Sequence, residues 1–328
     1  MRSRDPCATD SGAWQGSNCE SRPDRSAILE AVIERLKAFA RAKLPAPIYG
    51  RYRALRIKRY IADYSPRIVE HDYAGFALRV HLEDPLAEGW YDRDWEEPAE
   101  ISELRRGRLT NGATVIEVGA HQGIVGLILA RIVGPAGSVV AVEAEPHNAA
   151  VARRNVAINQ ANNMLILHAA GAATSGEVTF IEGLNGRVSL NERAGAIKVE
   201  AMTIDDLARL HGHPDVVLID VEGFEAHVLE GATETLKLAA TDFCVEVHSL
   251  ANLEEASSTV HDVTRHFDGR EYQITVALAG DTPPGLDSTH LESDWQPVEA
   301  GLHEQGVRCF LVARGLGLAE RSDDFPYR

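Results

Sequence analysis

The chain has few cysteines and no long hydrophobic run among its 328 residues. Its four cysteines are scattered, without a Cys-x-x-Cys motif, and we expect Cys244 and Cys309, which lie in apolar runs, to be reduced core residues. No apolar run reaches the roughly 18 residues that a transmembrane helix needs, so none is predicted. Residues 1–20 lack the hydrophobic centre of a signal peptide. A cytoplasmic protein is therefore expected.

Positive charge is also scarce. The formal net charge of -16 argues against a general nucleic-acid-binding role, which needs a basic surface. Basic residues nevertheless concentrate in residues 41–67, where Asp63 is the one acidic residue. This segment is either a solvated face or a contact for an anionic substrate, a carrier or a membrane surface. The remaining composition is ordinary for a soluble globular protein.

The first hundred residues differ in composition from the rest of the chain. Residues 1–25 are polar, and we expect them to be disordered. Residues 26–99 are predicted to form an α-helical N-terminal extension or lid. Its expected elements are a helix at Ala27–Lys43, a basic helix at 48–65 and a strand or hairpin at Val69–Leu82. The main domain is expected at 100–316, with a C-terminal tail at 317–328.

From about residue 100, short apolar runs alternate with amphipathic segments. This alternation predicts an α/β fold with a doubly wound, mostly parallel, seven-stranded sheet. The expected strands are Val115–Val118, Val139–Val142, Met164–Leu167, Val216–Ile219, Phe243–Val247, Tyr272–Val276 and Cys309–Ala313. The expected helices are Ile101–Leu109, Ile124–Val133, Asn148–Asn159, Ile204–Leu210 and Ala226–Leu238. An extra hairpin arm is predicted at Glu177–Ile181 and a surface loop at 280–301.

A glycine turn follows the first of these strands, and it predicts a nucleoside-cofactor site. The turn reads Glu117-x-Gly119-Ala120-His121-x-Gly123, and the next strand ends at Glu143. The glycines let the backbone approach a ligand, and the second carboxylate can accept both ribose hydroxyl protons. The pattern is not Gly-x-Gly-x-x-Gly, which a dinucleotide needs for its pyrophosphate. It therefore favours S-adenosylmethionine, whose cationic end suits Glu117.

Two further clusters follow buried strands. Asp220, Glu222 and Glu225 come directly after Val216–Ile219, at the edge where ligands bind in such sheets. Glu225 is predicted either to join the site or to cap the next helix. At the end of the following strand, Glu246 and the residue two positions on, His248, point to one side. His248 is a candidate proton acceptor or a structural histidine.

Two other segments are candidate walls of the pocket. Trp90–Trp95, which contains Tyr91, is rich in aromatic and acidic residues. It either lines the pocket or packs the extension on the sheet. The turn Asn185–Ser189 contains Arg187, which either reaches the site or serves only the hairpin.

These residues, in this order, resemble the FkbM family of S-adenosylmethionine-dependent methyltransferases over about Trp90 to His248. The resemblance is carried by Tyr91-Asp92, the turn Glu117–Gly123, Glu143, Pro146, Asn155, Asn159, Ala170, Asn185, Thr203-Ile204-Asp205, and Asp220, Glu222, Gly223 and Glu225. The chain departs from the family at Glu117, where Asp is more frequent, and at His121, where Asn is more frequent. The resemblance implies a class I, Rossmann-like methyltransferase that methylates hydroxyl oxygens on sugars, polyketides or other secondary metabolites.

From the motifs and this resemblance together, we assign expected roles. The predicted cofactor-binding residues are Glu117, Gly119, Ala120, His121, Gly123, Glu143, Ala144, Ala170 and Asp220. The predicted acceptor-binding residues are Tyr91, Glu222 and Glu246, and the predicted catalytic residues are His248 and Asp220. No metal ligand is assigned. The expected partner is a small-molecule, sugar or carrier-linked acceptor, and a homo-oligomer is possible.

Three alternatives to a metal-free O-methyltransferase stay open. Asp220, Glu222, Glu246 and His248 offer the ligands of a metal-assisted methyltransferase. An NAD-dependent oxidoreductase would suit Glu143, but the missing third glycine speaks against it. A non-catalytic S-adenosylmethionine-binding protein would keep the same pocket.

Overall fold

The computed structural model describes residues 46–190, 196–278, 296–297 and 308–317. The contacts of these residues place them in one unit, Ala46–Arg328. The predicted disordered segment, the helix expected at Ala27–Lys43 and most of the loop and tail near the C-terminus lie outside the described residues.

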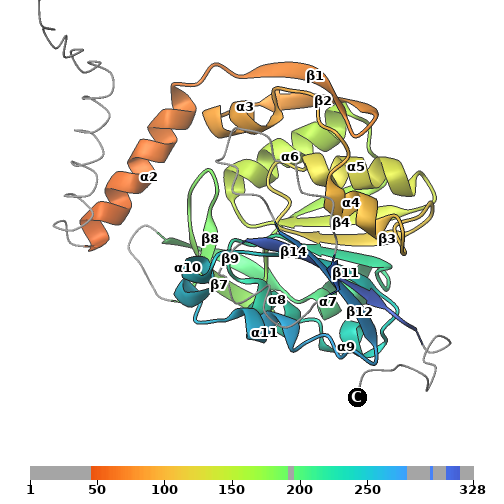
Figure 1. The fold of residues 1–328 in the computed structure, drawn as a ribbon. Helices are drawn as coiled ribbons and strands as arrows, with labels where there is room; N and C mark the ends of the chain where they lie inside the picture. The colour runs from red at the N-terminus through yellow and green to blue at the C-terminus, as the bar shows by residue number, and fades with distance from the viewer. Residues whose placement is uncertain (1–45, 191–195, 279–295, 298–307, 318–328) are drawn as a thin grey trace, which may run out of the picture. The chain divides into compact units, whose positions relative to one another are not determined.

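The central sheet confirms the predicted α/β fold. Its strand order is β13-β12-β14-β11-β10-β3-β4-β5. The strands are β3 (Thr114–Val118), β4 (Ser138–Glu143), β5 (Met164–His168), β10 (Val216–Ile219), β11 (Asp242–Val247), β12 (Tyr272–Leu278), β13 (Gln296–Pro297) and β14 (Cys309–Gly315). The five strands from β11 to β5 are parallel, and β14 is antiparallel to β11 and β12 (Figure 1). Two-residue β13 adds an eighth strand to the seven predicted.

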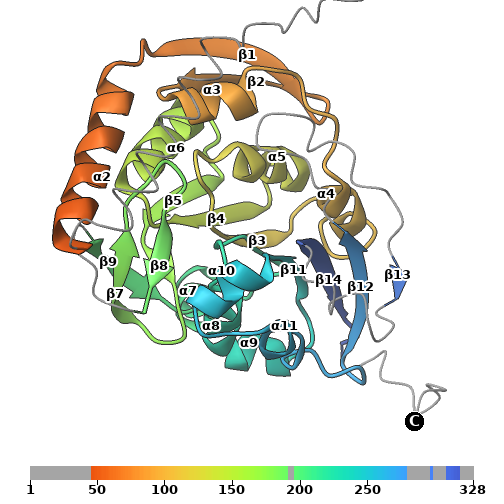
Figure 2. The same cartoon turned by 60° about the vertical axis from the view of Figure 1, so that its left-hand side comes forward.

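Helices cover both faces of the sheet (Figures 1 and 2). On one face lie α4 (Ala99–Leu104), α5 (Ile124–Val133) and α6 (Pro146–Ile158), and on the other lie α7 (Ile204–His211), α8 (Glu225–Glu230), α9 (Thr233–Lys237), α10 (Leu250–Glu255) and α11 (Val260–Thr264). Strand β10 is apolar throughout because both of its faces are buried. Val216 and Leu218 pack in the core that contains residues of α4, α5 and α6, whereas Val217 and Ile219 pack in the core that contains residues of α7, α8 and α9.

The prediction of a single helix at Ala226–Leu238 is wrong, because the chain there forms two helices, α8 and α9. Between them, a Cβ on Gly231 would lie 2.2 Å from the carbonyl oxygen of Ala172, so the chain is pressed against another backbone segment. The Asp205 carboxylate accepts hydrogen bonds from the backbone N–H groups of Glu234 and Thr235, both at 2.9 Å. A side chain distant in sequence therefore caps the start of α9.

The predicted hairpin arm is confirmed and is larger than expected. It is a second sheet of order β6-β9-β7-β8, made of β6 (Ala170–Gly171), β7 (Gly176–Ile181), β8 (Arg187–Ser189) and β9 (Ala196–Met202). Strand β6 begins two residues after β5 ends. The arm therefore starts at the carboxyl edge of the central sheet.

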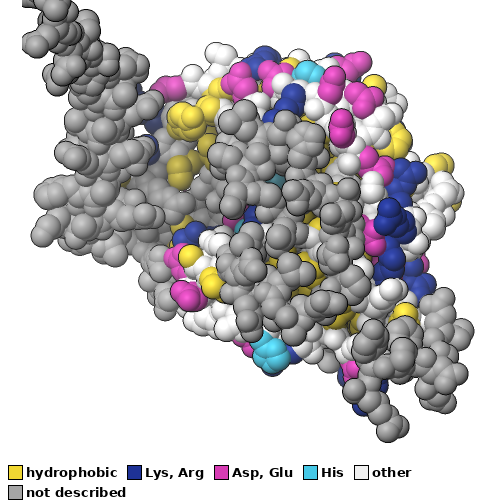
Figure 3. All heavy atoms as spheres, in the orientation of Figure 1, with side chains coloured by type: hydrophobic (Ala, Val, Ile, Leu, Met, Phe, Trp, Pro, Cys, Tyr) yellow, Lys and Arg dark blue, Asp and Glu magenta, His cyan; other side chains and the backbone are white. Residues whose placement is uncertain are grey.

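The described part of the N-terminal extension mixes helices with a hairpin. It contains α2 (Ala46–Ala62), the antiparallel pair β1 (Arg67–Tyr73) and β2 (Phe76–Leu82), and α3 (Pro85–Tyr91). This confirms the basic helix and the hairpin, although the extension as a whole is not purely helical. Charged side chains of both signs gather over β1 and α3 (Figure 3), where Arg67 pairs with Glu88 and Asp92 at 2.7 and 2.5 Å.

Asn155 of α6 and Asn159, the residue that follows α6, hold the hairpin on the main domain. The Oδ1 atoms of Asn159 and Asn155 accept hydrogen bonds from the backbone N–H groups of Arg79 and His81, at 2.9 and 2.7 Å. The Nδ2 of Asn155 donates to the carbonyl oxygen of Gln122 at 2.9 Å. Asn155 therefore joins the extension, α6 and the glycine turn.

No helix within the described ranges has both the length and the apolar character that a bilayer crossing requires.

Replacing Asn155 with Ala should destabilise the protein. Asn155 is fully buried, so the change leaves two buried backbone groups without partners and should lower the free energy of unfolding by about 2 kcal/mol. Urea denaturation followed by circular dichroism measures the change. Asn162→Ala, at an exposed position, is the matched control. Equal midpoints for the two variants would show that Asn155 does not hold these elements together.

Candidate active site

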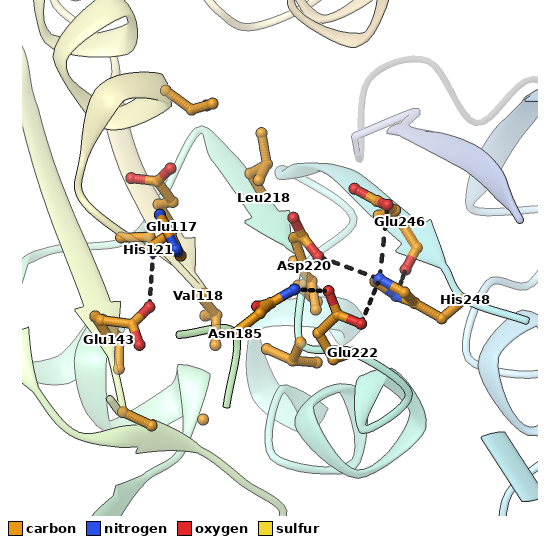
Figure 4. Close-up of a pocket in the computed structure, with 18 of the residues that line it drawn as sticks. Glu117, Val118, His121, Glu143, Asn185, Leu218, Asp220, Glu222, Glu246 and His248 are labelled. Atoms are coloured by element: carbon orange, nitrogen blue, oxygen red, sulfur yellow. Dashed lines mark hydrogen bonds and ion pairs between the residues drawn. The ribbon is translucent and has the colours of Figure 1, made fainter. Parts of the chain in front are cut away.

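A cavity of about 500 Å³ lies at the carboxyl ends of β3, β4, β10 and β11. It is lined by all but one of the predicted site residues, namely Tyr91, Glu117, Gly119, Ala120, His121, Glu143, Ala144, Ala170, Asp220, Glu222, Glu246 and His248. The exception is Gly123. The structure thus brings residues from six separate stretches of the sequence to one edge of the sheet, and Figure 4 labels several of them.

The glycines of the turn are required by neighbouring protein atoms. A Cβ on Gly119, whose φ is +97°, would lie 1.7 Å from the carbonyl oxygen of Asp220. Gly123 has a φ of +81° and stands at the start of α5, where a Cβ would lie 3.2 Å from the Cβ of Ala152. Gly123 therefore serves the packing of α5 on α6, while Gly119 lets the cofactor turn lie against the turn after β10.

Backbone donors fix the carboxylate of Glu143 in position. Its Oε2 accepts a hydrogen bond from the backbone N–H of His121, and its Oε1 accepts one from Glu145, both at 2.7 Å. Burial raises the pKa of Glu143 to about 8, despite these donors. Each oxygen still has lone-pair capacity for a further donor from a ligand.

Glu117 lies inside β3 and lines the same cavity. It is 1% exposed, and its Oε2 has no hydrogen-bond partner among the described residues. Burial, together with the charge of Glu143, raises the pKa of Glu117 to about 8. A bound cation would favour the ionised form of this carboxyl group, because opposite charges stabilise each other in a poorly solvated site.

His121 bridges two walls of the cavity. Its Nε2 is 3.1 Å from the carbonyl oxygen of Leu184, and its Nδ1 is 2.7 Å from the Tyr91 hydroxyl. A carbonyl can only accept, so Nε2 carries the proton and the Tyr91 hydroxyl donates to Nδ1. Burial lowers the pKa of His121 to about 4, which keeps the ring neutral. Both ring nitrogens are thus occupied by protein partners, and Tyr91 both lines the pocket and packs the extension.

His248 lies at the centre of the carboxylate cluster. Its Nδ1 donates to Oε1 of Glu225 at 2.6 Å. Its Nε2 faces Asp220, Glu222 and Glu246, with oxygen distances of 3.6, 3.4 and 3.6 Å (Figure 4). Burial works against the imidazolium, but the carboxylates of Glu222 and Glu225 outweigh it and raise the pKa of His248 well above its ordinary value.

Some residues of the turn Asn185–Ser189 reach the cavity and others do not. Asn185 donates from Nδ2 to Oε1 of Glu222 at 2.6 Å and lines the cavity. Arg187 also lines it, while pairing with Glu255 at 2.5 Å. Ser189 is not among the lining residues.

The sequence did not identify three contacts at the site. Glu225 has a fully buried side chain and orients His248. The motif that contains Glu225 was visible in the sequence, but its contact with His248, which follows a different strand, was not. Arg308, which contacts Glu246, stands just before β14 and carries no motif. Asp84 accepts from Nε2 of Gln122 at 2.7 Å and lies 3.0 Å from Nε2 of His147, which ties α3 to the glycine turn.

Removing the charge of Glu117 should change how stability depends on pH. The folded pKa of about 8 exceeds the ordinary value of 4.5, so the stabilisation is complete below about pH 4.5 and is lost as pH rises through about 8. Between about pH 5 and pH 9, the Tm of the wild-type chain should fall by several degrees more than that of Glu117→Gln. Differential scanning fluorimetry measures both, with Glu70→Gln on the exposed face of β1 as control. Parallel curves for wild type and Glu117→Gln would contradict this account.

Residues 117–274 match the family model described as the methyltransferase FkbM domain. None of the curated proteins matches the sequence. A solved structure of methyltransferase FkbM from Methylobacillus flagellatus KT is similar at 16% sequence identity and a TM-score of 0.39. That match covers 61% of this chain and 43% of the other, so this chain spans less than half the length of that protein.

Two further solved structures are similar at comparable distance. A SAM-dependent O-methyltransferase from Thermotoga maritima has 14% identity and a TM-score of 0.39, with 78% of this chain and 80% of the other covered. A precorrin-6y C5,15-methyltransferase from Geobacter metallireducens GS-15 has 15% identity and a TM-score of 0.38, with 66% and 88% covered.

The family match begins at Glu117 and extends into β12, so it contains the glycine turn, the carboxylate cluster and the hairpin arm. S-adenosylmethionine is the cofactor expected of such a domain. Residues 117–274 of this chain are a methyltransferase domain of the FkbM family.

Proposed function

We propose that this chain transfers a methyl group from S-adenosylmethionine to a hydroxyl oxygen of a sugar, glycan or other secondary metabolite. One observation carries the proposal. A single cavity joins the fixed carboxylate of Glu143 and the carboxylate of Glu117, whose Oε2 has no partner in the described part of the chain, to the cluster around Asp220 and His248. A nucleoside end and a proton-accepting end are thus parts of one space.

The residues of the first end fit S-adenosylmethionine, which supplies a methyl group on a positively charged sulfur. Glu143, held by two backbone donors, would accept the ribose hydroxyl protons. Glu117 and Asp220 would face the cationic portion. The small residues of the wall, Gly119, Ala120, Ala144 and Ala170, would leave room for the adenosine and methionine portions. His121 would act through its backbone N–H, which positions Glu143, and Gly123 through the packing of α5.

The residues of the second end suit an acceptor that bears hydroxyl groups. Glu222 and Glu246 are carboxylates that line the cavity, and an ionised carboxylate can only accept hydrogen bonds. Such side chains recognise donors such as the hydroxyl groups of a sugar. Tyr91, at the wall toward the extension, would add a flat apolar surface for the acceptor.

Methyl transfer to an alcohol requires that the hydroxyl proton leave as the new bond forms, and His248 is the first candidate to accept it. Glu225 holds Nδ1 of the ring, so the proton would be taken by Nε2, the atom that faces the cavity, once Nε2 has released the proton that the raised pKa of His248 favours there. Asp220 is the second candidate. The remaining residues contribute by holding the two reactants in line, which supplies much of the acceleration in transfers of this kind.

Three predictions made from the sequence remain part of this proposal. The catalytic domain would span residues 100–316, with 26–99 as an extension that walls the site. The protein would act in the cytoplasm. It would function alone or as a homo-oligomer, without nucleic acid.

Calorimetry tests the cofactor. The wild-type chain should bind S-adenosylmethionine and S-adenosylhomocysteine, and Glu143→Ala should bind both at least about tenfold more weakly, because a charge-assisted hydrogen bond contributes roughly 1.5–3 kcal/mol. Glu177→Ala, at an exposed position of β7, is the control. If the wild-type chain bound neither S-adenosylmethionine nor S-adenosylhomocysteine, the proposed function would be contradicted.

A second measurement separates the proton acceptor from the cofactor site. Release of S-adenosylhomocysteine is followed with a panel of hydroxylated glycosides as acceptors. His248→Ala should lower kcat by about 10²–10⁴-fold, the range of general-base catalysis, while calorimetry shows little change in S-adenosylhomocysteine affinity. An unchanged kcat would remove His248 from this role.

A further inference from the structure

The carboxylate cluster around His248 has the geometry of a metal centre. One ligand atom from each of Asp220, Glu246 and His248 lies within 4.8 Å of the others. We propose that these three side chains bind a divalent cation at the acceptor end of the cavity. The inference rests on the proposed function, because it names how the same site would engage the acceptor.

The orientation of His248 is the strongest support. Its side chain is 5% exposed, and its Nδ1 donates to the fully buried carboxylate of Glu225. A histidine that binds a metal commonly donates its other ring nitrogen to a carboxylate, which fixes the tautomer and the direction of the ring. In the neutral form of that tautomer, Nε2 has a free lone pair that faces Asp220 and Glu246, and a bound cation would take the place of the proton that the neighbouring carboxylates otherwise favour there (Figure 4).

The distances suit an ion better than direct hydrogen bonds. Nε2 lies 3.4 Å from an oxygen of Glu222 and 3.6 Å from oxygens of both Asp220 and Glu246, and all three distances exceed the usual N–H···O length of about 2.9 Å. Ligand atoms that each lie about 2.1 Å from one ion are separated by roughly 3.0–4.2 Å. The two separations from Nε2 to Asp220 and Glu246 fall in that range, and all three ligand atoms lie within 4.8 Å of one another.

The charges around the cluster favour a second cation. Four carboxylates, those of Asp220, Glu222, Glu225 and Glu246, surround one histidine. Arg308 contacts Glu246 and compensates one negative charge. Glu225 and Glu246 are buried, and carboxylates grouped in such a place are costly unless further positive charge is present. A divalent ion would provide it.

Glu222 lies beside the three proposed ligands, and two asparagine amides hold it in place. Its Oε1 accepts from Nδ2 of Asn185 at 2.6 Å, and its Oε2 accepts from Nδ2 of Asn252 at 3.4 Å. It would stand beside the ion and help to neutralise it. Asp220 is half-exposed, with a side chain that is 38% accessible, so an ion there would be reachable from the cavity.

A set of two carboxylates and one imidazole suits a first-row divalent ion such as Mn²⁺, since imidazole is a poor ligand for Ca²⁺ and Mg²⁺. With three protein ligands, the ion would keep open positions for acceptor oxygens. It would lower the pKa of a hydroxyl group beside it and orient that group toward the cofactor end. With the ion bound, Nε2 of His248 would be a ligand and could not accept the proton, so the free carboxylate oxygen of Asp220, the second candidate named above, would receive it.

Mn²⁺ binding to the full chain is measured by the loss of the free-ion signal in electron paramagnetic resonance, after EDTA treatment and removal of the chelator. We expect one ion per chain. Asp220→Asn and His248→Gln should abolish binding, and Glu225→Gln should weaken it by roughly tenfold to a hundredfold. Arg308→Gln should tighten it, because the variant removes the cation that competes for Glu246. Glu254→Gln, on the exposed face of α10, should match the wild type.

The Arg308 variant keeps the test decisive if substitutions of buried residues prevent folding, because its side chain is 51% exposed and the expected change is a gain. An unaltered Mn²⁺ signal with the wild-type chain, or equal affinity in all variants, would overturn the inference. Calorimetry with S-adenosylhomocysteine on the same preparation separates the two proposals. Cofactor binding without Mn²⁺ binding rejects the cation alone, whereas Mn²⁺ binding without cofactor binding rejects the proposed function.

Discussion

The close approach of Gly119 to the backbone of Asp220 is the contact around which the site is arranged. The Asp220 N–H donates to the carbonyl oxygen of Val118 at 2.9 Å, and the Asp220 carbonyl occupies the space where a Cβ on Gly119 would be. The turn after β3 and the turn after β10 therefore lie against each other. Because β3 and β10 are adjacent parallel strands, every side chain that follows either strand is delivered to the same edge. The cavity is a consequence of that adjacency.

Buried carboxyl groups give this cavity its character, and their surroundings differ. Glu143 receives two backbone N–H donors, whereas one oxygen of Glu117 has no partner among the described residues. Near His248, the Oε1 of Glu225 accepts from the ring Nδ1 and from the N–H of Gly223 at 2.9 Å, whereas its Oε2 has no partner among the described residues. A folded chain tolerates buried acids when donors or counter-charges are present. Of these two partly satisfied carboxyl groups, Glu117 is the one that lines the cavity, where a ligand can complete it.

The N-terminal extension is part of the site as well as of the core. Tyr91 of α3 donates to His121, and Asp84 at the start of α3 accepts from Gln122, so two neighbouring residues of the glycine turn are held by the extension. His121, which departs from the Asn usual in the family, connects Tyr91 to Leu184 in the hairpin arm. Its role in this chain is to join two walls of the cavity.

Regular patterns in the sequence were sufficient to predict the central sheet and the positions of most residues that line the cavity. The apolar run of β10 and the Glu-x-Gly turn after β3 follow from local periodicity and from glycine, so both were predictable. The break between α8 and α9 was not, because it depends on Ala172 and Asp205, which are distant in sequence. The role of Glu225 and the contact of Arg308 with Glu246 also depend on which strands become neighbours.

The sequence by itself thus determined the α/β class, the cofactor turn and the list of carboxylates, since each follows from the residue types and their spacing. The tertiary structure alone decided which of these groups face one another. The parallel alignment of β10 with β11, and the antiparallel return of β14, set the distances from His248 to Asp220 and place Arg308 on Glu246. Spacing along the chain cannot specify such distances, because they arise between strands that pair only after the core has packed.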